Sequence, residues 1–216
     1  MDPSDYHFLT TWRVEGTTGE VADVLRDPLE LVRWWPAVYV GAEELDGPDL
    51  RGLGQRVRLR TKGWLPSTQQ WDCVVTESRY PERFGFDATG DLCGRGLWTL
   101  QQDGAQVKAT FEWTVRVQKP WLRALAPVVR PLLEADHRWA MAQGEESLRL
   151  ELLRRRASTP DARRSLPAPP GPVTYAAVGI LAGAAVIGGS LGYLILRRRR
   201  RASARRPEGR QLRHEA

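Results

Sequence analysis

The chain has 216 residues, a net charge of +6 and nine tryptophans, and it is long enough to bury one sizeable core. Its charge is divided unevenly. Residues 1–153 carry 18 basic and 23 acidic side chains, a net of −5, whereas residues 154–216 carry 14 basic and 3 acidic ones, a net of +11. A nucleic-acid-binding domain would carry a basic patch on its own surface. We therefore expect no nucleic-acid partner.

The segment up to Pro36 predicts a strand followed by two short helices. Apolar residues mix with threonines over residues 7–15, as in a strand, and the turn GTTGE follows. Thr18 stands before residues 20–25 and is expected to cap a helix there. A second short helix is expected to end at a pair of tryptophans, because the following Pro36 starts an extended segment.

The segment from Gln55 to Val117 predicts an antiparallel sheet. Apolar residues recur there at every second position, which is typical of strands with one apolar and one polar face. The clearest run covers residues 107–117, and Asp103 and Gly104 make the hairpin turn before it. We expect about six strands joined in chain order, with one strongly apolar face.

Helical periodicity returns after Pro120. Apolar residues recur at spacings of three and four as far as Leu152, so a long helix can lay one apolar stripe across the sheet. The predicted order is strand, two helices, about six strands and a long helix. The fold class is therefore α+β.

Two segments in this order resemble the START-like polyketide cyclase and dehydrase (SRPBCC) superfamily. They are WRVEGTTGEVADVLRDPLELVRWWPAV near the N-terminus and HRWAMAQGEESLRLEL in the long helix. The resemblance covers about residues 6–153. It implies a helix-grip fold, in which a curved antiparallel sheet wraps round a long C-terminal helix. It also implies an apolar cavity between sheet and helix that holds lipids, polyketides, sterols or plant hormones.

The candidates to line such a cavity are aromatic residues of the sheet and a few residues of the helix. The aromatic side chains either line the cavity or fill the core, and the sequence leaves both alternatives open. On the helix, Met141 would lie opposite them, and His137 is either a polar group at the end of the cavity or a solvated histidine. Arg95 and Asp87 are further polar candidates if the domain moves protons. The aromatic candidates are Trp71, Phe86, Trp98, Phe111 and Trp113.

The sequence predicts no metal and no cofactor. Its three histidines lie far apart and have no carboxylate at ligand spacing, and no phosphate-binding or dinucleotide-binding glycine motif occurs. The two cysteines, Cys73 and Cys93, match no metal or redox spacing, so we expect free thiols.

The C-terminal part predicts a membrane anchor in three pieces. Residues 154–172 are rich in proline and arginine, which is typical of a disordered linker. Residues 173–196 hold no charged side chain and, at about 1.5 Å per residue, reach roughly 36 Å, enough to cross a hydrocarbon core of about 30 Å. A basic tail, 197–216, begins with consecutive arginines. We expect a single-pass transmembrane helix.

The predicted span raises the questions of pairing and of orientation. Gly179 and Gly183 stand four apart, so the helix either forms a homodimer through small residues or is simply a weakly apolar anchor. Nine arginines follow the span and five precede it, and the positive-inside rule would then place the domain outside the cytoplasm. The free cysteines and the polar N-terminal segment, which lacks a leader, favour the opposite, and we expect a cytoplasmic domain. The tail should attract anionic membrane lipids.

Three functions are compatible with the sequence. The first is a membrane-anchored, non-catalytic module that binds a hydrophobic small molecule, such as a lipid or polyketide, between the sheet and the C-terminal helix. The second is a polyketide-type cyclase or dehydratase that acts on a lipophilic substrate. The third is an interaction scaffold. Binding and catalysis both require a cavity of several hundred cubic ångströms, and a scaffold requires none.

Overall fold

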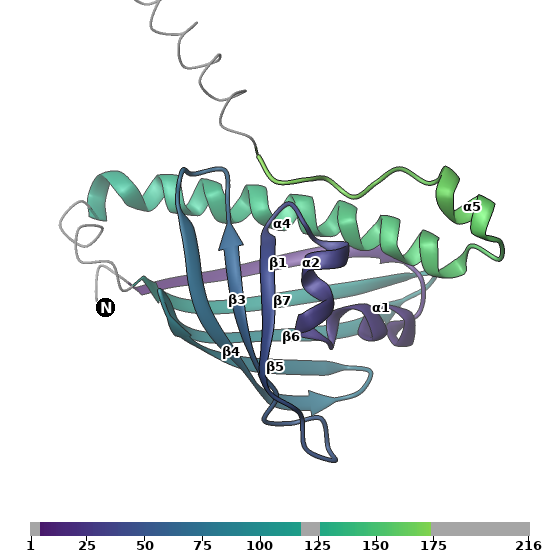
Figure 1. The fold of residues 1–216 in the computed structure, drawn as a ribbon, viewed down its shortest axis with the longest axis horizontal. Coiled ribbons are helices and arrows are strands. Elements are labelled where there is room, and N and C mark those ends of the chain that lie inside the picture. The colour runs from purple at the N-terminus through teal and green to yellow at the C-terminus, as the bar shows by residue number, and fades with distance from the viewer. Residues whose placement is uncertain (1–4, 118–125, 174–216) are drawn as a thin grey trace, which may run out of the picture. The chain divides into compact units, whose positions relative to one another are not determined.

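The computed structural model describes residues 5–117 and 126–173 (Figure 1). It confirms the predicted order of a strand, short helices, six strands and a long helix. The N-terminal elements are β1 (Asp5–Glu15), α1 (Thr18–Leu25), the 3-10 helix η1 (Pro28–Glu30) and α2 (Leu31–Trp34). The strands that follow are β2 (Tyr39–Asp46), β3 (Arg56–Lys62), β4 (Thr68–Arg79), β5 (Arg83–Gly90), β6 (Leu92–Asp103) and β7 (Gln106–Val117). The helices after them are α4 (Ala126–Arg156) and α5 (Pro160–Ser165).

The seven strands form one antiparallel sheet in the order β1-β7-β6-β5-β4-β3-β2. Strands β2 to β7 pair in chain order, and β1 joins the sheet beside β7. The sheet curves around α4, and α1 and α2 lie on the same side as α4 (Figure 1). The architecture is therefore the expected α+β helix-grip arrangement.

The N-cap of the first helix lies one residue earlier than predicted, and the helix begins at Thr18 rather than at residue 20. Thr17, and not Thr18, is its N-cap, and the Thr17 hydroxyl accepts a hydrogen bond from the Glu20 amide at 3.2 Å. The Glu20 carboxylate in turn accepts a hydrogen bond from the Thr17 amide at 2.8 Å. This reciprocal arrangement requires the glutamate three positions after the cap, which selects Thr17.

The C-terminal end of α4 is fixed to the N-terminal helices by charged side chains. Glu151 is buried and accepts two hydrogen bonds from Arg33, at 3.0 and 2.9 Å, and one from Arg155 at 2.8 Å. Arg156 donates to Glu20 at 2.7 Å, and this contact lowers the pKa of Glu20 to about 2. These charge-assisted hydrogen bonds hold the C-terminal end of α4 against α1 and α2.

The segment predicted as a linker contains structure. α4 continues to Arg156, and α5 lies within residues 154–172. The Thr159 hydroxyl caps α5 by accepting a hydrogen bond from the Ala162 amide at 3.1 Å, and Pro160 occupies its first turn. A capping threonine followed by proline is a typical start of a helix. The high proline and arginine content of the segment does not indicate this local signal.

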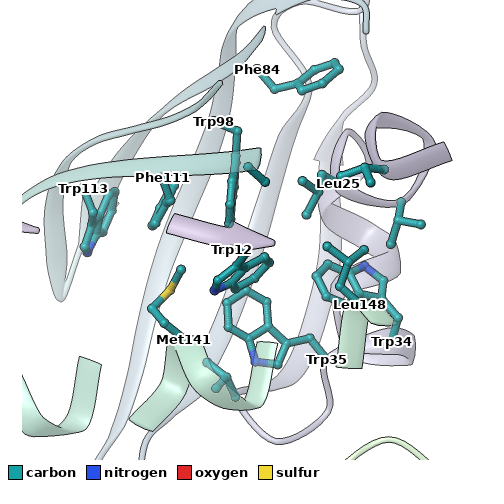
Figure 2. Packing of buried hydrophobic residues seen from close by; sticks show 14 of the residues in the cluster. Trp12, Leu25, Trp34, Trp35, Phe84, Trp98, Phe111, Trp113, Met141 and Leu148 are labelled. Atoms are coloured by element: carbon teal, nitrogen blue, oxygen red, sulfur yellow. The ribbon is translucent and has the colours of Figure 1, made fainter. Parts of the chain in front are cut away.

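The closed part of the core lies where α4 crosses the tryptophans of the N-terminal segment (Figure 2). Trp12 is 1% exposed, and its ring centroid lies 5.4 Å from that of Trp35 and 4.7 Å from that of Trp98. Both Trp12 and Trp35 approach Gly144 of α4 so closely that a Cβ atom there would overlap their indole rings. Gly144 therefore permits this contact between helix and sheet.

Candidate ligand-binding cavity

A cavity of about 650 Å³, called here the large cavity, lies between the inner face of the sheet, α4 and the segment around η1. This volume lies within the usual range for small-molecule sites. Its deep part reaches His137 and Met141 of α4, and its outer part is formed by residues that include Asp27, Arg51 and Tyr80. The described core is therefore not completely filled.

An aromatic wall, formed by Trp71, Phe86, Trp98, Phe111 and Trp113, lines the large cavity on the sheet side. Ring centroids of neighbouring members lie between 4.6 and 6.3 Å apart, from Trp98–Phe111 to Phe86–Phe111. The residues come from four adjacent strands and point inward because side chains alternate along each strand. Neighbouring rings stack on one another, and together they make a continuous aromatic surface against which a planar ring can pack.

Gly96 makes this wall continuous. It is in register with Phe86 on β5 and with Trp113 on β7, so it lies between the two aromatic residues. A Cβ atom at Gly96 would overlap the Phe86 ring. The missing side chain lets the centroids of Phe86 and Trp113 approach to 5.5 Å across the intervening strand.

His137 is the principal titratable group that α4 contributes to the large cavity. Its ring stacks on Phe8 with centroids 4.0 Å apart, and its Nε2 lies 3.3 Å from the Thr10 hydroxyl oxygen. Burial, aided by the nearby charge of Arg138, lowers the pKa of His137 to about 4. The imidazole is therefore neutral near pH 7, and it can both donate and accept hydrogen bonds.

Thr61, Cys73 and Tyr39 are further polar groups that the sheet contributes to the large cavity. The Thr61 hydroxyl accepts a hydrogen bond from the Trp71 indole at 3.1 Å, and burial raises the pKa of the Cys73 thiol to about 12, with a smaller effect from the charge of Asp87. Burial also raises the pKa of Tyr39. These groups are all uncharged near pH 7, so the inner part of the cavity favours neutral molecules. Both cysteines, Cys73 and Cys93, are free.

A second cavity of about 350 Å³, called here the small cavity, adjoins the large one. It is lined by residues of β1, the β3–β4 loop and the N-terminal half of α4. The Asp136 carboxylate of α4 accepts hydrogen bonds from the loop amides of Trp64, at 2.8 Å, and Leu65, at 3.2 Å. This contact fixes the loop against the helix.

Seven of the nine candidate residues from the sequence lie together. The five aromatic residues, His137 and Met141 all line the large cavity. Asp87 and Arg95 do not. Asp87 alternates with the inward Phe86 and is exposed, and Arg95 is opposite it in register and contacts Glu77 at 3.4 Å. Both therefore lie on the outer face of the sheet, because a strand presents alternate residues to opposite faces.

Several lining residues were not among the candidates. Leu59, Thr61 and Cys73 lie at inward strand positions and could have been found by extending the same alternation. Arg51 and Tyr80 come from connecting segments, where no period in the sequence indicates which side chain faces a cavity. Within residues 5–117 and 126–173, no group of His, Cys, Asp or Glu is arranged to hold a metal ion.

The predicted transmembrane span, 173–196, lies outside the described residues except for Val173. In the part of the chain that the structure describes, no helix combines the length and apolar character needed to cross a membrane. The predicted pairing of the span through Gly179 and Gly183, and the basic tail 197–216, also fall on residues that are not described.

Comparison with known proteins shows the fold. No protein-family model matches the chain, and no curated protein matches it in sequence. Among solved structures, TTHA0849 from Thermus thermophilus is 15% identical with a TM-score of 0.60, and the alignment covers 70% of this chain and 100% of that one. The Zhui aromatase/cyclase from Streptomyces sp. R1128 is 19% identical with a TM-score of 0.56, over 71% of this chain and 97% of that one. The di-domain ARO/CYC StfQ from the steffimycin biosynthetic pathway is 13% identical with a TM-score of 0.53, over 73% of this chain and 53% of that one.

Proposed function

We propose that the domain binds a neutral, mainly apolar small molecule that contains a planar ring, and that the large cavity is the binding site. The observation that carries this proposal is the aromatic wall beside about 650 Å³ of open volume. Apolar surface drives the binding of such a ligand, and a few polar groups orient it. The neutral side chains of Thr61, Tyr39 and His137 supply those polar groups.

The experiment that tests this proposal is a titration with 1-acetylpyrene, a neutral planar ketone, followed by the anisotropy of pyrene emission. Val75→Phe adds a ring at a residue that lines the large cavity and should weaken binding at least about tenfold, because it occupies the ligand's volume. Val74→Phe makes the same change one residue earlier on β4, at a position in register with the exposed Arg56 and Asp87. It should leave the affinity unchanged.

The proposal fails if wild-type protein does not bind 1-acetylpyrene saturably, or if both phenylalanine variants bind it as the wild type does. Mass spectrometry of the protein purified from its host should, in addition, find a co-purified ring compound, and that compound would identify the natural ligand class.

A polyketide-type cyclase or dehydratase is the second candidate. Two observations favour it: the fold is like that of the Zhui aromatase/cyclase, and the neutral imidazole of His137 faces the large cavity. A neutral imidazole can accept a proton from a substrate held beside it. Binding without turnover is favoured here because, within the described residues, His137 has no carboxylate as a hydrogen-bond partner that would stabilise the imidazolium formed in such a step.

We also propose, from the sequence, that residues 173–196 anchor the domain in a membrane. The protein should then stay in the membrane pellet after an alkaline carbonate wash. Val186→Arg with Ile187→Arg places two charges in the middle of the span and should release it, because each arginine at a helix centre costs about 2.5–3.5 kcal/mol on insertion. The matched control is Ala202→Arg with Ala204→Arg in the basic tail, which should stay in the pellet. Release of the unaltered chain by the wash would contradict an anchor.

A further inference from the structure

The large and small cavities are neighbours with a common boundary. The residues that line both are Val38, Thr61, Leu92, Trp113, His137 and Ala140. These six residues therefore belong to the walls of both cavities and form their common boundary. The boundary also contains the two polar groups described above, the Thr61 hydroxyl and the His137 imidazole.

The two cavities extend toward opposite ends of β3. Residues 48–52 of the β2–β3 connection contribute to the large cavity, and residues 63–67 of the β3–β4 loop contribute to the small one. These connections leave β3 at its two ends (Figure 1). The seven residues of β3 extend roughly 20 Å at about 3.3 Å per residue, so the cavities together follow a path of about that length.

The linings of the two cavities differ in chemistry. The large cavity has the aromatic wall, whereas the small cavity combines the rings of Tyr6, Phe8 and Trp113 with aliphatic side chains. The aliphatic residues are Leu65, Leu132, Leu133 and Val115. The small cavity also contains Gln69, whose buried carbonyl oxygen accepts no hydrogen bond among the described residues. The loop wall of this cavity is held in place by Asp136.

We infer that the two cavities form one binding site for an elongated ligand. Its planar ring lies on the aromatic wall, an aliphatic chain extends into the small cavity, and an oxygen-bearing group between them meets Thr61 and His137. This inference rests on the proposed function and specifies its ligand class: a ring system that carries an acyl or alkyl chain, rather than a compact ring compound alone.

The test is a series of 1-acylpyrenes with acetyl, hexanoyl and decanoyl chains, measured by pyrene anisotropy on the full-length protein. Each methylene group buried in the small cavity should tighten binding by up to about fourfold. We expect the decanoyl probe to bind wild-type protein at least about tenfold more tightly than the acetyl probe. Leu133→Trp, which fills the small cavity from α4, should reduce this ratio to about threefold or less.

The matched control is Ala142→Trp, which introduces the same residue on α4 at an exposed position that lines neither cavity. It should keep the wild-type ratio. Leu65→Trp fills the small cavity from the loop, and it replaces Leu133→Trp if that variant does not fold. An unchanged chain-length ratio in the filled variants would overturn the elongated site and leave ring binding intact. Failure of every probe to bind wild-type protein would overturn ring binding as well.

Discussion

Trp12→Ala is expected to lower the free energy of unfolding by about 4 kcal/mol, as large-to-small changes of buried aromatic residues do. Trp12 is 1% exposed and contacts the rings of Trp35 and Trp98 and the α4 backbone at Gly144. Its removal would leave a void where the long helix meets the sheet. That junction is too crowded to collapse, because Trp35 already lies directly against Gly144.

Urea unfolding followed by far-ultraviolet circular dichroism measures this loss without depending on tryptophan emission. Trp64→Ala is the control, since Trp64 is in the β3–β4 loop and outside the buried core. Its backbone amide still donates to Asp136 after the change. The control should cost about 1 kcal/mol or less. Equal losses in the two variants would mean that Trp12 is not the centre of the core.

The strands and their inward residues could be predicted from the sequence because alternation along a strand is strictly tied to the face that each residue occupies. Phe111 and Trp113 belong to an unbroken alternating run, and they line the cavity. The same alternation predicts that Asp87 faces outward, since its neighbours Phe86 and Ala88 are apolar and face inward. Asp87 is therefore a candidate by its chemistry only, because its position in the strand faces outward.

Other parts of the site depend on contacts that no local pattern encodes. Gly96 matters because of the rings on β5 and β7, and its role follows from strand register rather than from its sequence neighbours. The small cavity depends on a hydrogen-bonded contact between Asp136 and a loop about seventy residues earlier in the chain. Pairings of this kind are fixed by tertiary structure, so sequence periodicity indicates the cavity wall but not the shape of the cavity.

His137→Gln is expected to remove most of the dependence of stability on pH between about pH 7 and 4.5. Burial lowers the pKa of His137 to about 4 in the folded protein, whereas an unfolded chain has an ordinary histidine pKa of about 6.5. Within this window the unfolded state binds a proton that the folded state does not. Acid therefore favours unfolding, and the stability is fully present only above about pH 6.5.

The wild-type free energy of unfolding should fall by about 2–3 kcal/mol across this window because of His137 alone. Urea unfolding at a series of pH values measures the slope. Carboxyl groups also affect the profile at its acid end. Burial raises the pKa of Asp136, which acts in the opposite direction, whereas the lowered pKa values of other carboxyl groups act below about pH 4.5 in the same direction as His137; these groups are Glu20, Asp49, Asp72, Glu146 and Glu151. The difference between wild-type protein and the variant isolates the contribution of the histidine from those of the carboxyl groups.

His7→Gln is the matched control, because His7 is exposed on β1 and stays in water when the protein folds. It should leave the dependence of the unfolding free energy on pH unchanged, and a wild-type slope in His137→Gln would show that the imidazole is not held neutral by burial.

A bound ligand should also change this slope. A neutral ring compound that covers His137 should steepen the slope by desolvating it further, whereas a ligand carboxylate would stabilise the imidazolium and flatten it. The sign of that change therefore reports the charge of the group that the ligand presents to the boundary between the two cavities.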